Sequence, residues 1–295
     1  MKIFVKKKIN KNDINNAEKI FNGKIKNHKL KKIFWEYPSS KQFIIYLKKF
    51  NTTIGMIRVI KKKIYLSQKF YNVACITTVG IFPDLRNLGY ARILMEKSNA
   101  YLKKKFNLSL LIARRKVDHF YNKFNFIGNS EFFSIHFKLV KKISNNNFKK
   151  KKRNSINNNL IKFYVDTNKK KNGYIQRENS DWKIINKKIF LSKFSINEFQ
   201  YKNISLGYIV FKKRSIIEYG YNKEFLKFFI LAIKIFFEKE VEIKNPDKRI
   251  INELKKNDEI YINRRHCTYG GHMINFYNNK ELKNINYNIN FFDEF

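Results

Sequence analysis

The sequence contains little proline, glycine or cysteine, and each shortage excludes a class of protein. Its 295 residues include 3 prolines and 10 glycines, which excludes collagen-like and low-complexity chains. The two cysteines, Cys75 and Cys267, are far apart, so a reducing cytoplasm is expected rather than a disulfide framework. Because 43% of the residues are hydrophobic, the chain can bury a sizeable core, and its length predicts about two domains.

Acidic residues are also scarce. Asp and Glu number 23 against 63 Lys and Arg, which gives a formal net charge of +40. Such a surface attracts nucleic acid and anionic membranes at low salt. The lysines are spread along the chain instead of forming one arm, so the sequence predicts only non-specific contact with nucleic acid.

Long uncharged apolar runs are missing too. The stretch that comes nearest, residues 225–237, is interrupted by Lys227 and Lys234. It falls short of the roughly 18 residues that a membrane span needs. Met1–Asn10 has lysines but no apolar run after them, so a signal peptide is not expected. A soluble, cytoplasmic protein is the prediction.

One stretch, residues 72–92, is predicted to form a strand, a break, a polar loop and the start of a helix. Tyr71–Phe82 is uncharged and rich in β-branched and aromatic residues, as in a strand covered on both faces. Gly80 predicts a bulge or a close approach by another chain segment, and Pro83 ends regular pairing. A helix follows whose apolar face would carry Ala91, Leu94, Met95, Ser98, Tyr101 and Leu102.

This arrangement suits anion binding. The first N–H groups of a helix have no partner within it, and the helix dipole adds partial positive charge there. Gly89 and Ala91 are small where a diphosphate would touch the main chain, and Arg86 adds a charge. The alternative is a basic turn before an ordinary helix.

Two motifs together resemble the GNAT N-acetyltransferases. The first is Arg86-x-x-Gly89-x-Ala91 after an uncharged strand, which is similar to the acetyl-coenzyme A loop of that superfamily. The second is residues 120–126, FYNKFNF, which resembles its Phe-Tyr-x-Lys-x-Gly-Phe signature. Asn125 stands where glycine is usual, and Asn is the next-best residue for the left-handed conformation. The resemblance covers roughly residues 1–142.

The resemblance implies an α/β fold of the α+β type, with a central mixed, mostly antiparallel sheet flanked by helices. It implies acetyl-coenzyme A as co-substrate and no metal. The main chain of Val79, Gly80 and Ile81 would contact the pantetheine and thioester. Tyr121 matches the general acid of the family, and its alternative role is that of a core aromatic. The diphosphate would lie on Asn87, Leu88, Gly89, Tyr90, Ala91 and Arg92.

Periodicity predicts the other elements of this first half. Asp13 is the expected N-cap of its first helix, and Lys61-Lys62 an expected turn. Strands are expected at Ile3–Val5, Phe43–Leu47, Ile54–Ile60, Ile64–Leu66, Leu108–Ala113 and Phe132–Val140, and helices at Asp13–Phe21, Leu30–Trp35 and Asp118–Phe124. An antiparallel meander followed by strand–helix–strand–helix–strand is the order found in GNAT proteins.

The expected domains are residues 1–143 and 160–285, with a solvated Asn- and Lys-rich linker at 144–159 and a tail at 286–295. For Lys149–Arg153 the alternative is a nucleic-acid or nuclear-targeting patch. The second unit is expected to contain Tyr208–Phe211, Ile216–Tyr219, Glu240–Ile243 and His272–Tyr277 as strands, and Phe225–Phe237 and Asp247–Lys255 as helices.

This second unit resembles a degenerate GNAT domain, so the chain is similar in layout to tandem GNAT proteins such as Eis-like acetyltransferases. Residues 219–222 enter the second unit's helix without an Arg-x-x-Gly-x-Ala motif. Only the first half is therefore expected to hold coenzyme A.

Several roles stay open at this point. The general base is unassigned among Glu36, Asp118, His119, Glu131, a water chain and the carboxylate of Phe295. Candidates for acceptor contact are Trp35, Glu36 and Tyr37, although an aromatic helix face packed on the sheet is the more expected role of this segment. A metal site at His266, Cys267 and His272 is less expected than a structural loop.

Two classes of function remain. One is acetyl transfer to a primary amine of a small acceptor, and the other is a GNAT-scaffold binding protein that docks on nucleic acid or an acidic partner. The segments expected to border the acceptor contain only Glu36 and Glu131 as acids. An anionic or neutral acceptor is therefore expected, unless Asp293 and Glu294 lie nearby.

Overall fold

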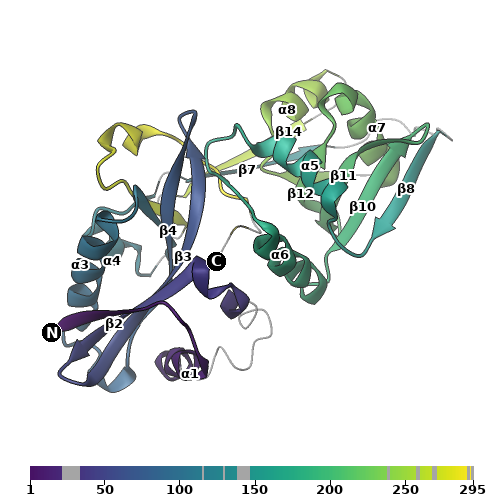
Figure 1. Cartoon of the computed structure of the whole chain (residues 1–295). Helices are drawn as coiled ribbons and strands as arrows, with labels where there is room; N and C mark the ends of the chain where they lie inside the picture. Colours follow the sequence, from purple (N-terminus) through teal and green to yellow (C-terminus); the bar gives the residue numbers. More distant parts are fainter. Residues whose placement is uncertain are drawn as a thin grey trace.

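The computed structural model describes residues 1–21, 34–114, 116–128, 130–137, 147–237, 240–256, 260–267, 271–290 and 293. These residues form two β-sheets with helices packed on them (Figure 1). Both sheets mix parallel and antiparallel pairs, which confirms the predicted α/β class, and two sheets fit the predicted layout of two units. No helix in the described ranges is long and apolar enough to cross a bilayer.

The first sheet has eight strands and contains the strand at the start of residues 72–92. Along it the order is β1-β2-β3-β4-β5-β15-β6, and β9 pairs with β3. The strands are β1 (Lys2–Lys6), β2 (Gln42–Lys49), β3 (Thr52–Leu66), β4 (Lys69–Ile81), β5 (Leu108–Ile112), β6 (Ile127–Gly128), β9 (Tyr174–Ile175) and β15 (His272–Asn275).

The second sheet has seven strands in the order β14-β7-β13-β12-β11-β10-β8. Its β11 and β12 contain the strands predicted at Tyr208–Phe211 and Ile216–Tyr219 and pair antiparallel, and β12 pairs in parallel with β13. The strands are β7 (Ser130–Phe137), β8 (Phe148–Arg153), β10 (Ser195–Tyr201), β11 (Ile204–Lys212), β12 (Ser215–Tyr221), β13 (Val241–Lys244) and β14 (Ile260–Cys267).

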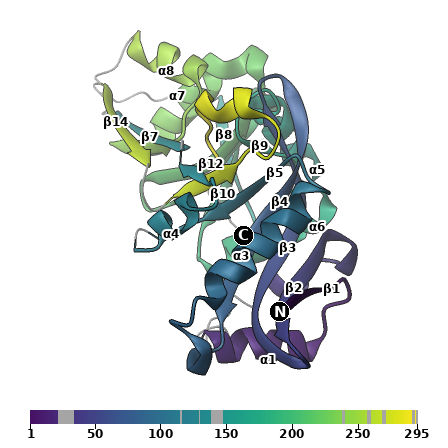
Figure 2. The same ribbon diagram turned by 90° about the vertical axis from the view of Figure 1, so that its left-hand side faces the viewer.

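The two sheets exchange one strand each. β7 belongs to the first half of the sequence, yet it pairs with β13 and β14, and Figure 2 shows it beside β14. β15 belongs to the second half, yet it pairs with β5 and β6. The sequence predicts both strands but places each in its own half, and that placement is wrong. Alternating apolar residues specify a strand without specifying its partners.

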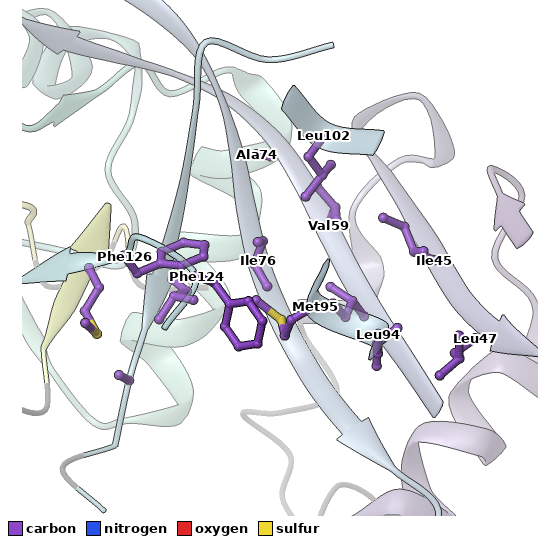
Figure 3. Close-up of a cluster of buried hydrophobic side chains, with 14 of the residues drawn as sticks. Ile45, Leu47, Val59, Ala74, Ile76, Leu94, Met95, Leu102, Phe124 and Phe126 are labelled. Atoms are coloured by element: carbon purple, nitrogen blue, oxygen red, sulfur yellow. The ribbon is translucent and has the colours of Figure 1, made fainter. Parts of the chain in front are cut away.

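Helices pack on both sheets. They are α1 (Lys11–Ile20), α3 (Tyr90–Lys103), α4 (Asp118–Asn122), α5 (Asn158–Asn168), α6 (Asn179–Leu191), α7 (Leu226–Phe237) and α8 (Lys248–Lys255). Of these, α1 and α3 lie on opposite faces of the first sheet, and α5 and α7 contact the second. Leu94, Met95 and Leu102 of α3 pack on Val59 and Ile76 of the sheet (Figure 3). On the opposite face Ala17 and Ile20 of α1 contact another part of β2 and β3.

Three local predictions are wrong in detail. Asn10, not Asp13, is the N-cap of α1, because its side chain accepts from Asn12 and Asp13 while Asp13 closes the capping box. Lys61-Lys62 lies inside the continuous strand β3, which extends past the sheet as a hairpin with β4. The predicted linker holds β8 and the start of α5, because pairing with β10 makes a strand of a segment without apolar periodicity.

The two sheets share one local feature: in each, a glycine on one strand lies in close contact with the main chain of the next strand. Gly55 of β3 lies opposite Ile81 of β4, and a Cβ on it would lie 2.6 Å from the carbonyl oxygen of Gly80. Gly207 of β11 lies opposite Tyr221 of β12, and a Cβ there would lie 2.3 Å from the carbonyl oxygen of Gly220. β12 and α7 therefore occupy in the second unit the places of β4 and α3.

Candidate functional site

A crevice opens where β4 and β5 diverge. The two strands pair in parallel from Val73–Ile76 to Leu108–Leu111, and no further. β4 then continues to Ile81, paired only with β3 on its other side. The carboxyl ends of adjacent parallel strands, where their connections separate, are the usual place for a ligand in such sheets.

A β-bulge exposes main-chain groups in this crevice. Met56 pairs with Gly80 and Arg58 with Thr77, so Thr78 and Val79 together lie opposite Ile57. Thr78 has a φ of 54°, which turns its peptide out of the regular ladder. The sequence predicts a bulge or a close approach at Gly80, and the bulge lies one to two residues earlier. Gly80 instead leaves room for the side chain of Ile20 of α1. A Cβ added to Gly80 would lie 2.2 Å from the Cγ2 of Ile20.

The connection from β4 to α3 forms an open cradle of amides. A short 3-10 turn at Pro83–Leu85 is followed by Asn87 with φ 63° and Gly89 with φ 74°. Gly89 is the N-cap of α3 and has no side chain to cap it, so the first N–H groups of the helix are open. An added Cβ on Gly89 would meet nothing within 4 Å. The space beside this helix start is free for an anion.

The two arginines of the loop are held by other groups. The Arg86 guanidinium donates to the carbonyl oxygen of Ile20 at 2.6 Å and to that of Ile81 at 3.4 Å, so it fastens the loop to the end of α1. Arg92 donates to Glu96 at 2.8 Å, and its side chain is 76% exposed. The cradle itself is therefore made by backbone amides.

Tyr121 lies in α4, which begins shortly after the carboxyl end of β5. Its half-buried ring packs edge-on against Phe120 and Phe126, with centroids 5.3 and 6.2 Å away. Burial raises the pKa of Tyr121 and Arg114 opposes that rise, so the phenol is neutral and carries its proton. Its hydroxyl has no hydrogen-bond partner among the residues described.

The departure at Asn125 does not change the turn after α4. Asn125 has a φ of 63°, the left-handed conformation that glycine usually provides. The N–H of Phe126 donates to the carbonyl oxygen of Tyr121 at 3.3 Å, which closes the helix end and packs Phe126 under Tyr121. The second motif therefore fixes the ring of Tyr121 against the core.

The candidates for a general base lie in different surroundings. Glu36 is half-exposed and pairs with Lys187 of α6. Asp118 is buried, one oxygen accepts from the N–H of His119, and the other has no hydrogen-bond partner among the described residues. His119 is 71% exposed and 3.9 Å from that carboxylate. The side chain of Glu131 and all of Glu294 and Phe295 lie outside the described residues.

Trp35 and Tyr37 serve as packing partners. The guanidinium of the buried Arg58 lies 4.5 Å from the Trp35 ring centroid and 6.0 Å from that of Tyr37. Gln42 accepts from Arg58 at 2.6 Å and donates to the carbonyl oxygen of Tyr37. The rest of the predicted helix at Leu30–Trp35 lies outside the described residues, apart from a short 3-10 turn at Phe34–Glu36.

The three residues considered for a metal site belong to different sheets. His266 and Cys267 are in β14 of the second sheet, whereas His272 begins β15 in the first. Within the described ranges no group of three or more metal-ligating side chains occurs. A structural role, and not metal binding, remains the interpretation of these three residues.

Comparison with known proteins adds an independent line of evidence. Residues 7–127 match the family model described as acetyltransferase (GNAT) domain. No curated protein matches the sequence. A probable N-acyltransferase of Enterococcus faecalis is similar in structure, with a TM-score of 0.66 and 15% identity over 94% of this chain and 73% of the other.

Two further structures show the same overall likeness. A GCN5-related N-acetyltransferase of Anabaena variabilis has a TM-score of 0.65 and 16% identity, and covers 94% of this chain and 73% of its own. Eis1 of Mycobacterium abscessus has a TM-score of 0.58 and 10% identity, with 94% and 74% covered. Residues 7–127 thus match the GNAT acetyltransferase domain family, and the chain as a whole has the fold of GNAT N-acetyltransferases.

Proposed function

We propose that this protein transfers an acetyl group from acetyl-coenzyme A to the primary amine of a small acceptor. The observation that carries the proposal is the continuity of the crevice with the cradle. The bulge at Thr78–Val79, the loop at Asn87 and the uncapped start of α3 at Gly89 follow one another along the chain. They offer main-chain groups over the length of an extended thioester with a diphosphate.

The chemistry needs few side chains. Diphosphate oxygens would accept from the free amides at the start of α3, where the helix dipole favours negative charge. The pantetheine arm would pair with the free edge of β4 at Val79, Gly80 and Ile81. The neutral acceptor amine would attack the thioester carbonyl, the C–S bond would break, and the thiolate would take a proton from Tyr121 as general acid. The new amide nitrogen would release a proton to water, and water would return one to Tyr121.

Calorimetry of acetyl-coenzyme A with the variant Gly89→Val tests the cradle. The branched side chain would fill the open space beside the helix start, so coenzyme A binding should be abolished while the fold persists. Arg86→Ala should weaken binding less, because the amides remain in place. Equal affinity of the wild-type chain and Gly89→Val would refute the cradle.

A matched control separates the loss of space from backbone strain. Lys213, in the turn between β11 and β12, has a φ of 56° and is exposed. Lys213→Val places the same β-branched side chain in a left-handed conformation far from the crevice. Because Lys213 already has a Cβ there, it should destabilise the chain less than Gly89→Val, and it should bind coenzyme A like the wild type.

The binding-protein alternative rests on the charge of +40. Strand β8, at the edge of the second sheet, carries the exposed residues Lys149, Lys151 and Lys152. Charged residues on an edge strand also prevent edge-to-edge aggregation, which explains them without a polyanion. Micromolar affinity for acetyl-coenzyme A would favour the enzyme, and its absence the binding protein.

A further inference from the structure

A cavity of about 720 Å³ lies where the β3–β4 hairpin meets the second unit. Its walls come from four separate segments: the hairpin tip at 65–68, the connection from α5 to β9 at 168–174, the connection from β13 into α8 at 245–251, and residues 288–290. Figure 1 shows the hairpin tip reaching toward the second unit. The volume is that of a site for a small organic ligand.

Cations dominate this cavity. Lys170, Lys171 and Lys248 line it, against a single carboxylate, Asp247. Lys170 and Lys248 are exposed, and neither makes a hydrogen bond or ion pair with any described residue. The half-buried ammonium of Lys171 is positioned by Asn168, which accepts from it at 2.9 Å. Three lysine ammonium groups thus line one cavity.

One carboxylate cannot neutralise three ammonium groups, and Asp247 also interacts with Arg249 and neutral donors. One oxygen of Asp247 accepts from the N–H of Ile250 at 3.0 Å and so caps α8. The other accepts from the hydroxyl of Tyr221 at 2.6 Å and from Arg249 at 3.4 Å. Lys171 stands 3.9 Å from it, which is the limit of an ion pair. The cavity therefore keeps a surplus of positive charge.

The remaining walls suit a polar organic body. Tyr65 brings a ring to the cavity, and Asn172, Asn288 and Asn290 bring amides that both donate and accept. A ring beside ammonium groups fits a planar base that carries phosphate. We propose that this cavity binds a small phosphorylated molecule of nucleotide size, at a site separate from the β4–β5 crevice.

The two sites lie at opposite ends of one strand. Gln68, which lines the cavity, precedes the first residue of β4, and the crevice begins at the last residues of the same strand. Ten residues lead from Gln68 to Thr78 at the bulge, roughly 33 Å at the usual rise. A ligand in the cavity therefore cannot be the coenzyme A in the crevice.

Calorimetric titration with ADP and with inorganic pyrophosphate tests the proposal. The chain should carry Gly89→Val throughout, so that adenine nucleotides bind only outside the cradle. The double variant Lys170→Met/Lys248→Met removes two cations that have no partner within the described chain, so the fold should be unaffected. ADP affinity should fall at least tenfold, and pyrophosphate affinity should fall with it.

The matched control is Lys162→Met/Lys255→Met. These lysines lie on α5 and α8 outside the cavity, both exposed, and their removal lowers the net charge equally. Less than a twofold change is expected from this pair. No ADP binding at millimolar concentration, or equal losses in the two pairs, would overturn the proposal.

The pH dependence of ADP binding gives a second readout. Burial lowers the pKa of Lys171 to about 8. The Asp247 carboxylate acts in the opposite direction and raises this pKa, whereas Arg249 lowers it further. The Lys171 ammonium also lies 3.4 Å from the hydroxyl of Tyr219. A bound phosphate stabilises the charged ammonium, so ADP affinity should fall several-fold from pH 7.5 to pH 9. Lys171→Arg stays charged and should remove that fall. An equal fall in both proteins would contradict a contact with Lys171.

Discussion

Three residues of the candidate site have a positive φ: Thr78 near the end of β4, and Asn87 and Gly89 in the connection to α3. Only Gly89 adopts that conformation without strain, so the other two store strain in the backbone. The sequence predicts the role of Gly89 from its position before a helix. Thr78 carries no such signal, because β-branched residues rarely adopt a positive φ. The residue that turns the strand outward was therefore not predictable from sequence.

Tyr121→Phe tests the general acid directly. The substitution keeps the ring against Phe120 and Phe126 and removes the hydroxyl, which has no partner within the described chain. The turnover number should fall by about 10²-fold or more, with KM little changed. Tyr101→Phe is the control, because Tyr101 packs on the same core from α3. An unchanged rate would leave Tyr121 as a core aromatic.

At the scale of secondary structure, the sequence predicts what local pattern determines. The strand at residues 69–81 and the helix from Tyr90 follow from an uncharged run and an apolar face of helical spacing. β8 is different, because lysine dominates it and its strand conformation depends on β10. The partners of β7 and β15 depend on the whole chain, so no local pattern could assign them.

His272, at the start of β15, makes the exchanged strand sensitive to acid. It is 1% exposed, and burial lowers its pKa to about 4. The unfolded chain binds a proton below about pH 6.5, whereas the folded chain does so only near pH 4. Stability is therefore complete above pH 6.5 and decreases as the pH falls toward 4.

Urea denaturation at pH 7 and pH 5 measures this effect. The free energy of unfolding should fall between the two pH values by about 2 kcal/mol more in the wild type than in His272→Gln. Gln cannot take up a proton, so the variant retains only the contributions of other groups. Identical decreases in the two proteins would show that His272 does not control the acid response.

At the scale of the whole molecule, the second unit repeats the layout of the first with its crevice filled. β12 and β13 pair only at Ser215–Ile216 and then diverge. The ring of Tyr219 occupies the gap, because its hydroxyl donates to Asn245 at 3.0 Å and accepts from the N–H of Asp247 at 2.8 Å. Tyr221 stacks beside it with centroids 6.2 Å apart.

The intact chain should therefore bind one acetyl-coenzyme A. Tyr219 and Tyr221 lie where β12 and β13 diverge, and the segment after β12 contains no glycine at the positions of a cradle. Isothermal titration gives the stoichiometry directly, and Gly89→Val should reduce it to zero. A value of two per chain would mean that Tyr219 and Tyr221 move aside for a second cofactor.

Net charge predicts the kind of acceptor. Glu36 is paired with Lys187, and Asp293 with Arg177 at 2.7 Å, so these acids are not free to hold a polycation. The field of the +40 chain should concentrate anions, so anionic or neutral amines should be the better acceptors, especially at low salt. Acetylation rates measured with amino acids, amino sugar nucleotides, spermidine and aminoglycosides at two ionic strengths test this preference. A preference for spermidine would contradict the prediction.

The exchange of β7 and β15 also determines when this protein can fold during its synthesis. β7 leaves the ribosome long before β13 and β14 exist, and β5 must wait for β15 to gain its neighbour. Neither sheet can be completed while the chain is still growing, so unpaired strand edges stay exposed for most of translation. The newborn chain should therefore depend on chaperones for longer than two independent domains of the same size would.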